Sequence, residues 1–516
     1  MSLALLAIVG AGGLITSLLF PIQTMKFYQR TAWGDSKTFM GGRNPTNPLQ
    51  GLCQGNGAAP ACWLIISSLL MHCCSRQGFG SSMLSPISKF LIEFLGEMYV
   101  DDTDLIVMNP SYQSGNDVIR DTQMSVDAWA NLLISTGGSL NPDKCYWYMV
   151  DYMNINGEWN YAPSTTWELT IPLPDGTRHK ITHLDTTHSN KMLGIWSNPA
   201  GDDTKHLEVN ILGKYKTWIN RLTNQYKLLP GLKYGLATLA TTSAEISHLL
   251  HRLEYKTLPL LGVNRSVKQE WRTIPKAFGG IGLCNLAIEQ MIGWANMLLQ
   301  HYGSPTTLGL KCRATLESLQ LEIGCRGNPL QECYRSRGIL ATPSWITSVW
   351  ERCHQMNLQF YLSYDIIRFP RENDIELITL FLQHGFSGMT LRQMNRCRLA
   401  LKAIFLSDIV TAGGRQLEHW VRGDKLGRQS RLTFAREEPT HQDWEQWDLF
   451  WTGWLHRNNS IPSPLGPWLH KSHQKWDWYY DSQANVLWNS MEDGWMKYEF
   501  CQTGINGYGQ ALQIIH

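Results

Sequence analysis

Two adjacent aspartates, Asp101 and Asp102, separate two short apolar runs in the stretch Glu97–Met108. Neighbouring carboxylates repel each other, and burying them is costly unless a cation neutralises them. The first run alternates apolar and polar side chains, which is typical of a strand, and Leu105–Met108 is a second strand. Because so few residues separate the two strands, the sequence predicts a β-hairpin with both aspartates on its tight turn.

A pair of carboxylates at the tip of a partly buried hairpin suits a divalent metal ion. Mg²⁺ prefers carboxylate oxygens together with substrate phosphates, and two such ions can activate an attacking oxygen and stabilise a leaving one. The alternative is an acidic turn that is simply solvated. An EF-hand is excluded, because Leu105 and Ile106 follow where that loop needs glycine and oxygen ligands.

The composition indicates a folded globular protein. The chain has 516 residues, of which 43% are hydrophobic and 17% charged, so it is a folded chain long enough for more than one domain. The net charge of +2 gives no overall indication of a nucleic-acid partner, and charge must be read locally. The twelve cysteines contain no C-x-x-C pair, so we expect neither a zinc site nor a disulfide framework. Free cysteines suit a reducing compartment, so we expect an intracellular location, in the nucleus or the cytoplasm.

The N-terminal run Leu3–Phe20 is largely apolar. It could form a membrane segment or signal peptide. Glycines interrupt the run and no basic residues precede it, so two buried helices, Leu3–Val9 and Leu14–Arg30, are favoured.

The segments around the aspartate pair add further signals. Gly51–Trp63 is rich in glycine and alanine and precedes a predicted helix, Leu64–Met71, so its backbone could approach a ligand closely. Asp121–Gly138 predicts an amphipathic helix, with one apolar side formed by Met124, Ala128, Leu132 and Leu133. After Ser139–Lys144 comes a predicted strand, Cys145–Val150. Trp167–Leu184 predicts a hairpin that turns at Asp175-Gly176.

Taken together, these segments resemble a reverse transcriptase of the non-LTR retrotransposon type. Five motifs occur in the family's order and spacing: Gln54-Gly55 with Pro60 for the glycine-rich motif, Tyr99-Val100-Asp101-Asp102 for the catalytic hairpin, Gly137–Lys144 for the motif after the palm helix, Met192-Leu193-Gly194 for the primer grip, and Phe278–Leu283 for a phrase beyond the thumb. Their joint occurrence is more specific than any one of them.

The resemblance implies an α+β fold in three parts. These are an incomplete right-hand polymerase palm with an antiparallel sheet and helices at 1–200, a helical thumb-like and connecting region at 201–302, and a Trp-rich, mostly helical C-terminal domain at 303–516. It implies RNA-directed DNA synthesis, in which a primer 3′-hydroxyl attacks a dNTP by two-metal chemistry with Mg²⁺, or alternatively Mn²⁺. The expected partners are an RNA template, a DNA primer and dNTP, with no membrane.

The resemblance also implies roles for single residues. Asp101 and Asp102 would be catalytic and hold the metal. Lys144 would lie near the leaving pyrophosphate as a general acid or charge clamp, although an ordinary exposed lysine is the alternative. The expected template, nucleotide or primer contacts are Gln54, Gly55, Tyr99, Leu193 and Gly194. Ordinary turn residues are the alternative for the glutamine motif and the Leu-Gly pair, and Tyr99 is expected to pack below the turn rather than to take part in the chemistry.

One departure concerns the family's first catalytic aspartate, which should lie on a strand before the first palm helix. No aspartate precedes Asp35, and Asp35 follows that helix, so we do not assign it this role. The fingers are missing as well. We therefore expect an N-terminally truncated polymerase that extends a primer poorly or not at all. A non-catalytic nucleic-acid-binding remnant is the first alternative, and a membrane-anchored structural protein is the second.

Beyond residue 200 the patterns are helical. An apolar stripe runs from Ile211 to Leu229, and residues 201–280 hold twelve Lys/Arg against six Asp/Glu, as in a thumb that grips nucleic acid. Helices are predicted at Asp374–His384 and Leu391–Ile409. Four tryptophans spaced three and four apart lie on one helix face that we expect to be core rather than a base-stacking surface: Trp444, Trp447, Trp451 and Trp454.

Overall fold

The structure is a computed structural model of the whole chain. It describes residues 13, 25–31, 33–41, 59–99, 102–108, 114–136, 138–155, 158–162, 167–192, 194–202, 204–213, 235–240, 245, 246, 248, 251, 255, 258, 259, 262–283, 285–362, 371–411, 413–418, 421, 422, 439–466, 478–481, 486–491, 494–502 and 510–515. The predicted helix Leu3–Val9 and most of the stripe that ends at Leu229 lie outside these residues.

The N-terminal half mixes helices with short strand pairs. Its elements are β1 (Lys26–Thr31), β2 (Gly34–Gly41), α3 (Ala59–Arg76), β3 (Ser81–Leu84), β4 (Leu91–Phe94), β5 (Gly96–Tyr99), β6 (Asp102–Leu105), α4 (Gly115–Ser135), the 3₁₀ turn η1 (Pro142–Lys144), β7 (Tyr146–Tyr148), β8 (Tyr152–Ile155), β9 (Glu158–Tyr161), β10 (Thr170–Pro172), β11 (Arg178–Lys180), β12 (Thr182–Leu184), β13 (Asn190–Met192), β14 (Ile195–Ser197), α5 (Thr204–His206) and the π-helix η2 (Leu207–Gly213). All described pairs are antiparallel except β7 with β12, which is parallel. The mixture of helices and small antiparallel sheets agrees with the predicted α+β class.

Several sequence predictions can be compared with these elements. The helix predicted at Leu64–Met71 is confirmed within the longer α3, and the hairpin around Asp175-Gly176 is confirmed as β10–β11, with Gly176 at φ +83°. The helix predicted at Leu14–Arg30 is wrong at its end, because residues 26–31 form β1 and pair with β2.

Helices α3 and α4 pack against hairpin β5–β6 through a small apolar core. The buried residues of this core are Leu70, Cys74, Leu95, Trp129 and Leu133. Leu133 was predicted to lie on the apolar side of α4, but Met124 was predicted wrongly, since it is 46% exposed. Trp129 has the largest apolar surface on this helix, and its burial turns the face containing Ser125, Trp129 and Leu133 inward.

The C-terminal half is mainly helical. It contains η3 (Leu236–Thr238), α9 (Gln269–Thr273), η4 (Lys276–Phe278), α10 (Leu286–His301), α11 (Thr307–Ile323), η5 (Pro329–Gln331), α12 (Tyr334–Arg337), η6 (Gly338–Leu340), α13 (Trp345–Met356), α14 (Leu377–Gln383), α15 (Gly388–Ala400), η7 (Leu406–Asp408), α16 (His441–Trp454) and η9 (Arg457–Asn459). Helix α11 begins where Thr306 accepts a hydrogen bond from the Gly309 amide, and it ends at Gly324, whose φ of +63° suits glycine.

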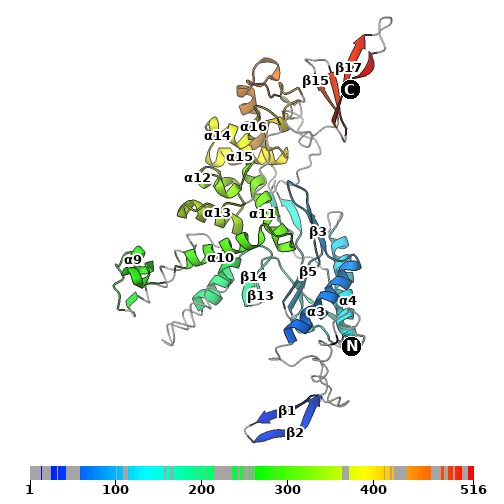
Figure 1. Cartoon of the computed structure of the whole chain (residues 1–516), viewed down its shortest axis with the longest axis vertical. Helices are drawn as coiled ribbons and strands as arrows, with labels where there is room; N and C mark the ends of the chain where they lie inside the picture. The colour runs from blue at the N-terminus through cyan, green and yellow to red at the C-terminus, as the bar shows by residue number, and fades with distance from the viewer. Residues whose placement is uncertain are drawn as a thin grey trace.

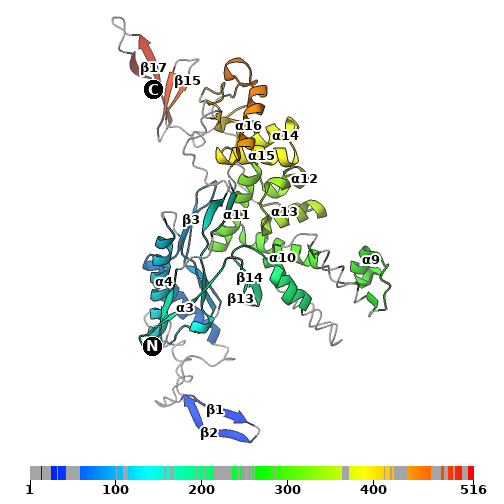
Figure 2. The ribbon, with the colours of Figure 1, turned by 180° about the vertical axis from the view of Figure 1, so that it is seen from behind.

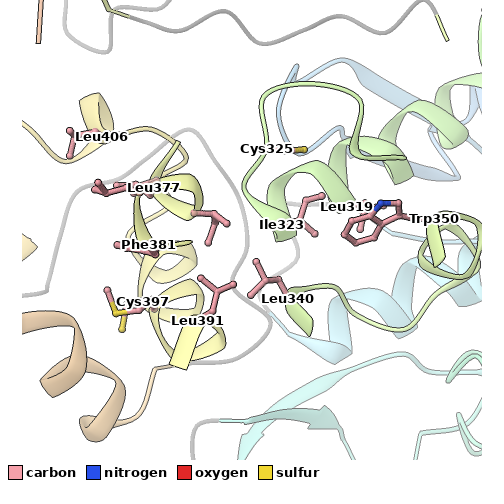
Figure 3. Close-up of a cluster of buried hydrophobic side chains, with 14 of the residues drawn as sticks. Leu319, Ile323, Cys325, Leu340, Trp350, Leu377, Phe381, Leu391, Cys397 and Leu406 are labelled. Atoms are coloured by element: carbon pink, nitrogen blue, oxygen red, sulfur yellow. The ribbon is translucent and has the colours of Figure 1, made fainter. Parts of the chain in front are cut away.

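One large apolar core joins α10 to α16. Figure 3 shows its side chains converging from α11, α13, α14 and α15, among them Leu319, Trp350, Phe381 and Leu391. The predicted core role of the tryptophan stripe is confirmed: Trp447 and Trp451 are fully buried, and Trp444 and Trp454 pack against the same core.

The predicted helices of this half are confirmed only in part. The segment predicted as Asp374–His384 contains the shorter α14. The helix predicted at Leu391–Ile409 is α15, which starts earlier and ends at Ala400. It ends there because Lys402 adopts a left-handed backbone at φ +55°, which breaks the helical repeat.

Two β elements lie at opposite ends of the molecule. The β1–β2 hairpin lies at one end, and a four-stranded antiparallel sheet of β15 (Trp478–Asp481), β16 (Val486–Met491), β17 (Gly494–Gln502) and β18 (Gln510–Ile515) lies at the other (Figures 1 and 2). Helices α10 to α16 lie between these ends, alongside β3 and β5. Within the described residues, none of the helices combines the length and apolar character needed to cross a membrane.

Candidate active site

The acidic hairpin forms, but its second strand lies earlier in the chain than predicted. Strand β5 pairs with β6 so that Tyr99 lies opposite Asp102 and Glu97 lies opposite Asp104. The second strand therefore begins at Asp102, and the prediction that it spans Leu105–Met108 was wrong. Because Asp102 pairs with Tyr99, it is a strand residue and not a turn residue as predicted. Asp101 and the Tyr99 side chain lie outside the described residues.

The close pairing of the two strands depends on Gly96. A Cβ atom on this residue would lie 1.9 Å from the backbone oxygen of Asp104. Any other side chain would therefore push β5 and β6 apart. Glycine at position 96 therefore allows the two strands that carry the acids to pair.

The hairpin has one apolar and one acidic face. Met98 and Leu105 pack against the core formed with α3 and α4. Because successive strand residues point to opposite faces, Glu97 and Asp104 lie on the other side, and Asp102 shares that side with Asp104. Burial of the apolar face thus fixes the carboxylates on the face turned away from α3 and α4.

Two neighbouring carboxylates act on Asp104. Asp104 is half-buried, and its pKa is raised, first by burial and then by the negative charges of Glu97 and Asp102. Glu97 is compensated from the helical half, because Lys311 of α11 places its Nζ atom 2.8 Å from Glu97 Oε1. The acidic face retains a local excess of negative charge that a cation could offset.

Strand β7 lies near this acidic face. Burial raises the pKa of the Tyr146 hydroxyl, and the charges of Asp104 and Asp102 raise it further, while a hydrogen bond with the Asn190 side chain opposes this shift. Burial also raises the pKa of Tyr148 to about 12, with contributions from Tyr146 and Asp104. Electrostatic effects of this kind require proximity, so the structure brings β7 and the start of β13 together with β6.

Tyr146 and Asn190 were not among the residues predicted from the sequence. The available signal was indirect: Tyr146 follows Lys144 by two residues. Lys144 itself is exposed, at the end of η1, where the Asn141 side chain accepts a hydrogen bond from the Asp143 amide. Tyr146, two residues after Lys144, lies near the acidic hairpin. A role for Lys144 itself as a general acid or charge clamp stays a prediction.

The segment predicted as a primer grip is the turn of a second hairpin. Strands β13 and β14 pair with Met192 opposite Ile195, so residues 193 and 194 connect them. Gly194 has φ +86°, a conformation that favours glycine, and its backbone oxygen accepts a hydrogen bond from the side chain of buried Asn210. The turn is thus held by η2. Leu193 lies outside the described residues.

Not all of the remaining predicted site residues lie within the described part of the chain. Gln54 and Gly55 lie outside the described residues, so their distance from the acidic hairpin stays a prediction. Among the described residues, no three His, Cys, Asp or Glu side chains gather closely enough to hold a metal ion. The Asp102 carboxylate is a hard oxygen group of the type that Mg²⁺ prefers, and only the resemblance assigns it and Asp101 as metal ligands.

No protein-family model matches the chain, and no curated protein matches it.

Proposed function

We propose that this chain carries the palm and following regions of an RNA-directed DNA polymerase of the non-LTR retrotransposon type. One observation supports this best. The two-residue hairpin between β5 and β6 buries its apolar face against α3 and α4 and presents Asp102 and Asp104 on the opposite face. An acidic face fixed in this way, with Tyr146 of β7 and Asn190 of β13 near it, supports the role that the motif order implies for this hairpin.

The chemistry would be nucleotidyl transfer. The primer 3′-hydroxyl attacks the α-phosphorus of the incoming nucleotide, a new P–O bond forms, and pyrophosphate leaves with the electrons of the broken P–O bond. When bound, a divalent ion would offset the negative charge of the phosphates. Asp102 would hold it together with Asp101, Lys144 would face the pyrophosphate, and the backbone at Gly194 would contact the primer.

A primer-extension assay with the full chain tests this proposal. The substrate is a DNA primer on an RNA template, with dNTPs and either Mg²⁺ or Mn²⁺, and single-nucleotide products are resolved. We expect weak extension that Asp102→Asn lowers by about 10²–10³-fold, the usual effect of removing one catalytic charge partner. Asp175→Asn, a change at an exposed turn far along the chain, serves as the matched control and should leave extension unchanged.

A second readout does not depend on turnover. Free Mn²⁺ can be followed by its EPR signal, and we expect the wild-type chain to bind the ion more tightly than Asp102→Asn. If neither extension nor a difference in Mn²⁺ binding is detected while the chain still binds the RNA–DNA hybrid, the polymerase proposal is wrong and a non-catalytic nucleic-acid-binding protein is supported.

A further inference from the structure

The short helix α5 and the π-helix η2 that follows it hold the β13–β14 hairpin by its backbone. π-Helical turns are rare and occur often at functional sites. Three side chains of this segment, Lys205, His206 and Asn210, bond to main-chain atoms of the hairpin or its flank. The Lys205 Nζ atom donates to the Ser189 oxygen, at 2.9 Å, directly before β13, and lies 4.1 Å from the ring centroid of Trp196.

His206 lies at the centre of this arrangement and is only 1% exposed. Its Nδ1 atom accepts a hydrogen bond from the Trp196 amide of β14, at 3.1 Å, and the Asn210 Nδ2 atom lies 3.1 Å from the same ring nitrogen. The ring also approaches Gly235, the residue before η3, where a Cβ atom would lie 3.4 Å from Nε2. The imidazole is thus enclosed by β14, η2 and the start of η3.

Two backbone partners fix the roles of these side chains. A main-chain amide can only donate, so the His206 Nδ1 atom that faces Trp196 carries a lone pair and the ring is neutral. A main-chain oxygen can only accept, so it is the NH₂ group of Asn210 that faces the Gly194 oxygen. The second hydrogen of this NH₂ group points to His206 Nδ1. We call this chain of bonds, from Gly194 through Asn210 and His206 to Trp196, the His206–Asn210 network.

The network acts on the turn that the motif order assigns to the primer. Gly194 adopts φ +86°, and the network holds its oxygen in place from below the turn. At the other end of the same hairpin, Asn190 shares a hydrogen bond with Tyr146, which lies near the acidic face. Buried polar groups are costly unless they are bonded, so a buried histidine and asparagine that both bond here serve to fix a backbone position that apolar packing alone would leave less defined.

We propose that His206 and Asn210 are positioning residues that hold the β13–β14 turn in the shape in which its backbone contacts the primer strand. Neither side chain would touch nucleic acid, because both are buried. A turn that is already fixed loses little conformational entropy when the primer binds, so the network raises affinity for the primer through its effect on Gly194. In taking the primer as the ligand of this turn, the inference rests on the proposed function.

The test measures two affinities of the full chain by fluorescence anisotropy, in EDTA and without nucleotide. One ligand is a labelled RNA template, and the other is the same RNA annealed to a DNA primer. His206→Leu and Asn210→Ala should each weaken binding of the hybrid by roughly tenfold, the usual effect of losing one hydrogen bond to a charged group, and leave binding of the RNA alone unchanged. Asn328→Ala is the matched control, because this buried asparagine also donates to a main-chain oxygen, that of Phe360 in the helical half.

Conservative variants separate positioning from packing. Asparagine at position 206 would place its Oδ1 atom where the ring has Nδ1, and this oxygen can accept the Trp196 amide. The amide group of glutamine would instead lie near the position of Nε2. We therefore expect His206→Asn to keep most of the affinity for the hybrid and His206→Gln to lose it. Hydrogen exchange of the segment that contains the Trp196 amide should be faster in His206→Gln than in wild type or His206→Asn.

Equal affinity for the hybrid in wild type and in folded His206→Leu would overturn the inference. An equal loss of hybrid and RNA binding, or a wild-type chain that does not bind the hybrid, would also overturn it. If His206→Leu does not fold, the comparison of His206→Asn with His206→Gln decides by the same criteria. Because the assay contains no metal and needs no turnover, a chain that binds the hybrid through the network but extends no primer would disprove the polymerase proposal alone.

Discussion

Asp374 offers a quantitative test of how the helical half is held together. It precedes α14, and its Oδ1 atom accepts hydrogen bonds from the amides of Ile375, at 2.9 Å, and Ser407, at 3.1 Å. Its Oδ2 atom is buried and has no hydrogen-bond partner among the residues that the structure describes. Burial raises the pKa of Asp374 from 3.8 to about 6, against the effect of its hydrogen bonds with Ser407, and the nearby Asp408 contributes to the rise.

The sign of the effect on stability follows from this raised pKa. Asp374 binds its proton more tightly in the folded chain than in the unfolded chain. Its protonated form therefore adds to the free energy of unfolding at low pH, and this stabilisation is lost as the pH rises through about 4 to 6. A pKa shift of one unit is worth about 1.4 kcal/mol, so the rise of the Asp374 pKa from 3.8 to about 6 corresponds to a total loss of about 3 kcal/mol. Roughly 2 kcal/mol of it falls between pH 4.5 and 7.5.

Asp374→Asn removes the titrating group and keeps an oxygen that can accept both amides. We expect the free energy of unfolding of the variant, relative to wild type, to increase by roughly 2 kcal/mol as the pH rises from 4.5 to 7.5. Urea unfolding followed by tryptophan fluorescence measures this, because Trp447 and Trp451 are buried in the core that α14 shares. All other carboxylates are common to both proteins, so the difference between them isolates Asp374. A difference that does not change with pH would refute the reasoning.

Two further changes test other parts of the structure. Asp443→Asn should destabilise the chain by about 3–5 kcal/mol at pH 7, because it removes the buried partner of the Arg396 guanidinium, which lies 2.6 Å from Asp443 Oδ1. Burial opposes ionisation of Asp443, but hydrogen bonds from Arg396 and Thr440 lower its pKa. The loss of stability measured by urea unfolding should therefore shrink as the pH falls below 4. Gly96→Ala should open the acidic hairpin and weaken Mn²⁺ binding in the EPR assay. Gly138→Ala is the control and should leave binding unchanged, because its Cβ would meet its nearest atom at 3.6 Å. Equal binding by both variants would contradict the role given to Gly96.

Local patterns in the sequence determined several elements correctly. The β5–β6 hairpin, the β10–β11 hairpin and the buried tryptophan face of α16 all follow from side-chain alternation, turn residues or helical spacing over about a dozen residues. These signals are local because each depends on how neighbouring side chains share one face of one element. They were weaker at element ends, where the register of β6 was set by the length of the turn rather than by hydrophobicity.

The tertiary structure alone decided what surrounds the acidic hairpin. Tyr146 and Asn190 reach its neighbourhood from separate strands, and Lys311 reaches Glu97 from α11, in the other half of the chain. The proximity of Lys89 and Lys402 could not be predicted from the sequence either, because it depends on Ile87 and Ile404 packing in one apolar cluster. Sequence spacing fixes which face a side chain occupies, but only the packing of distant elements determines which charges lie close enough to act on one another.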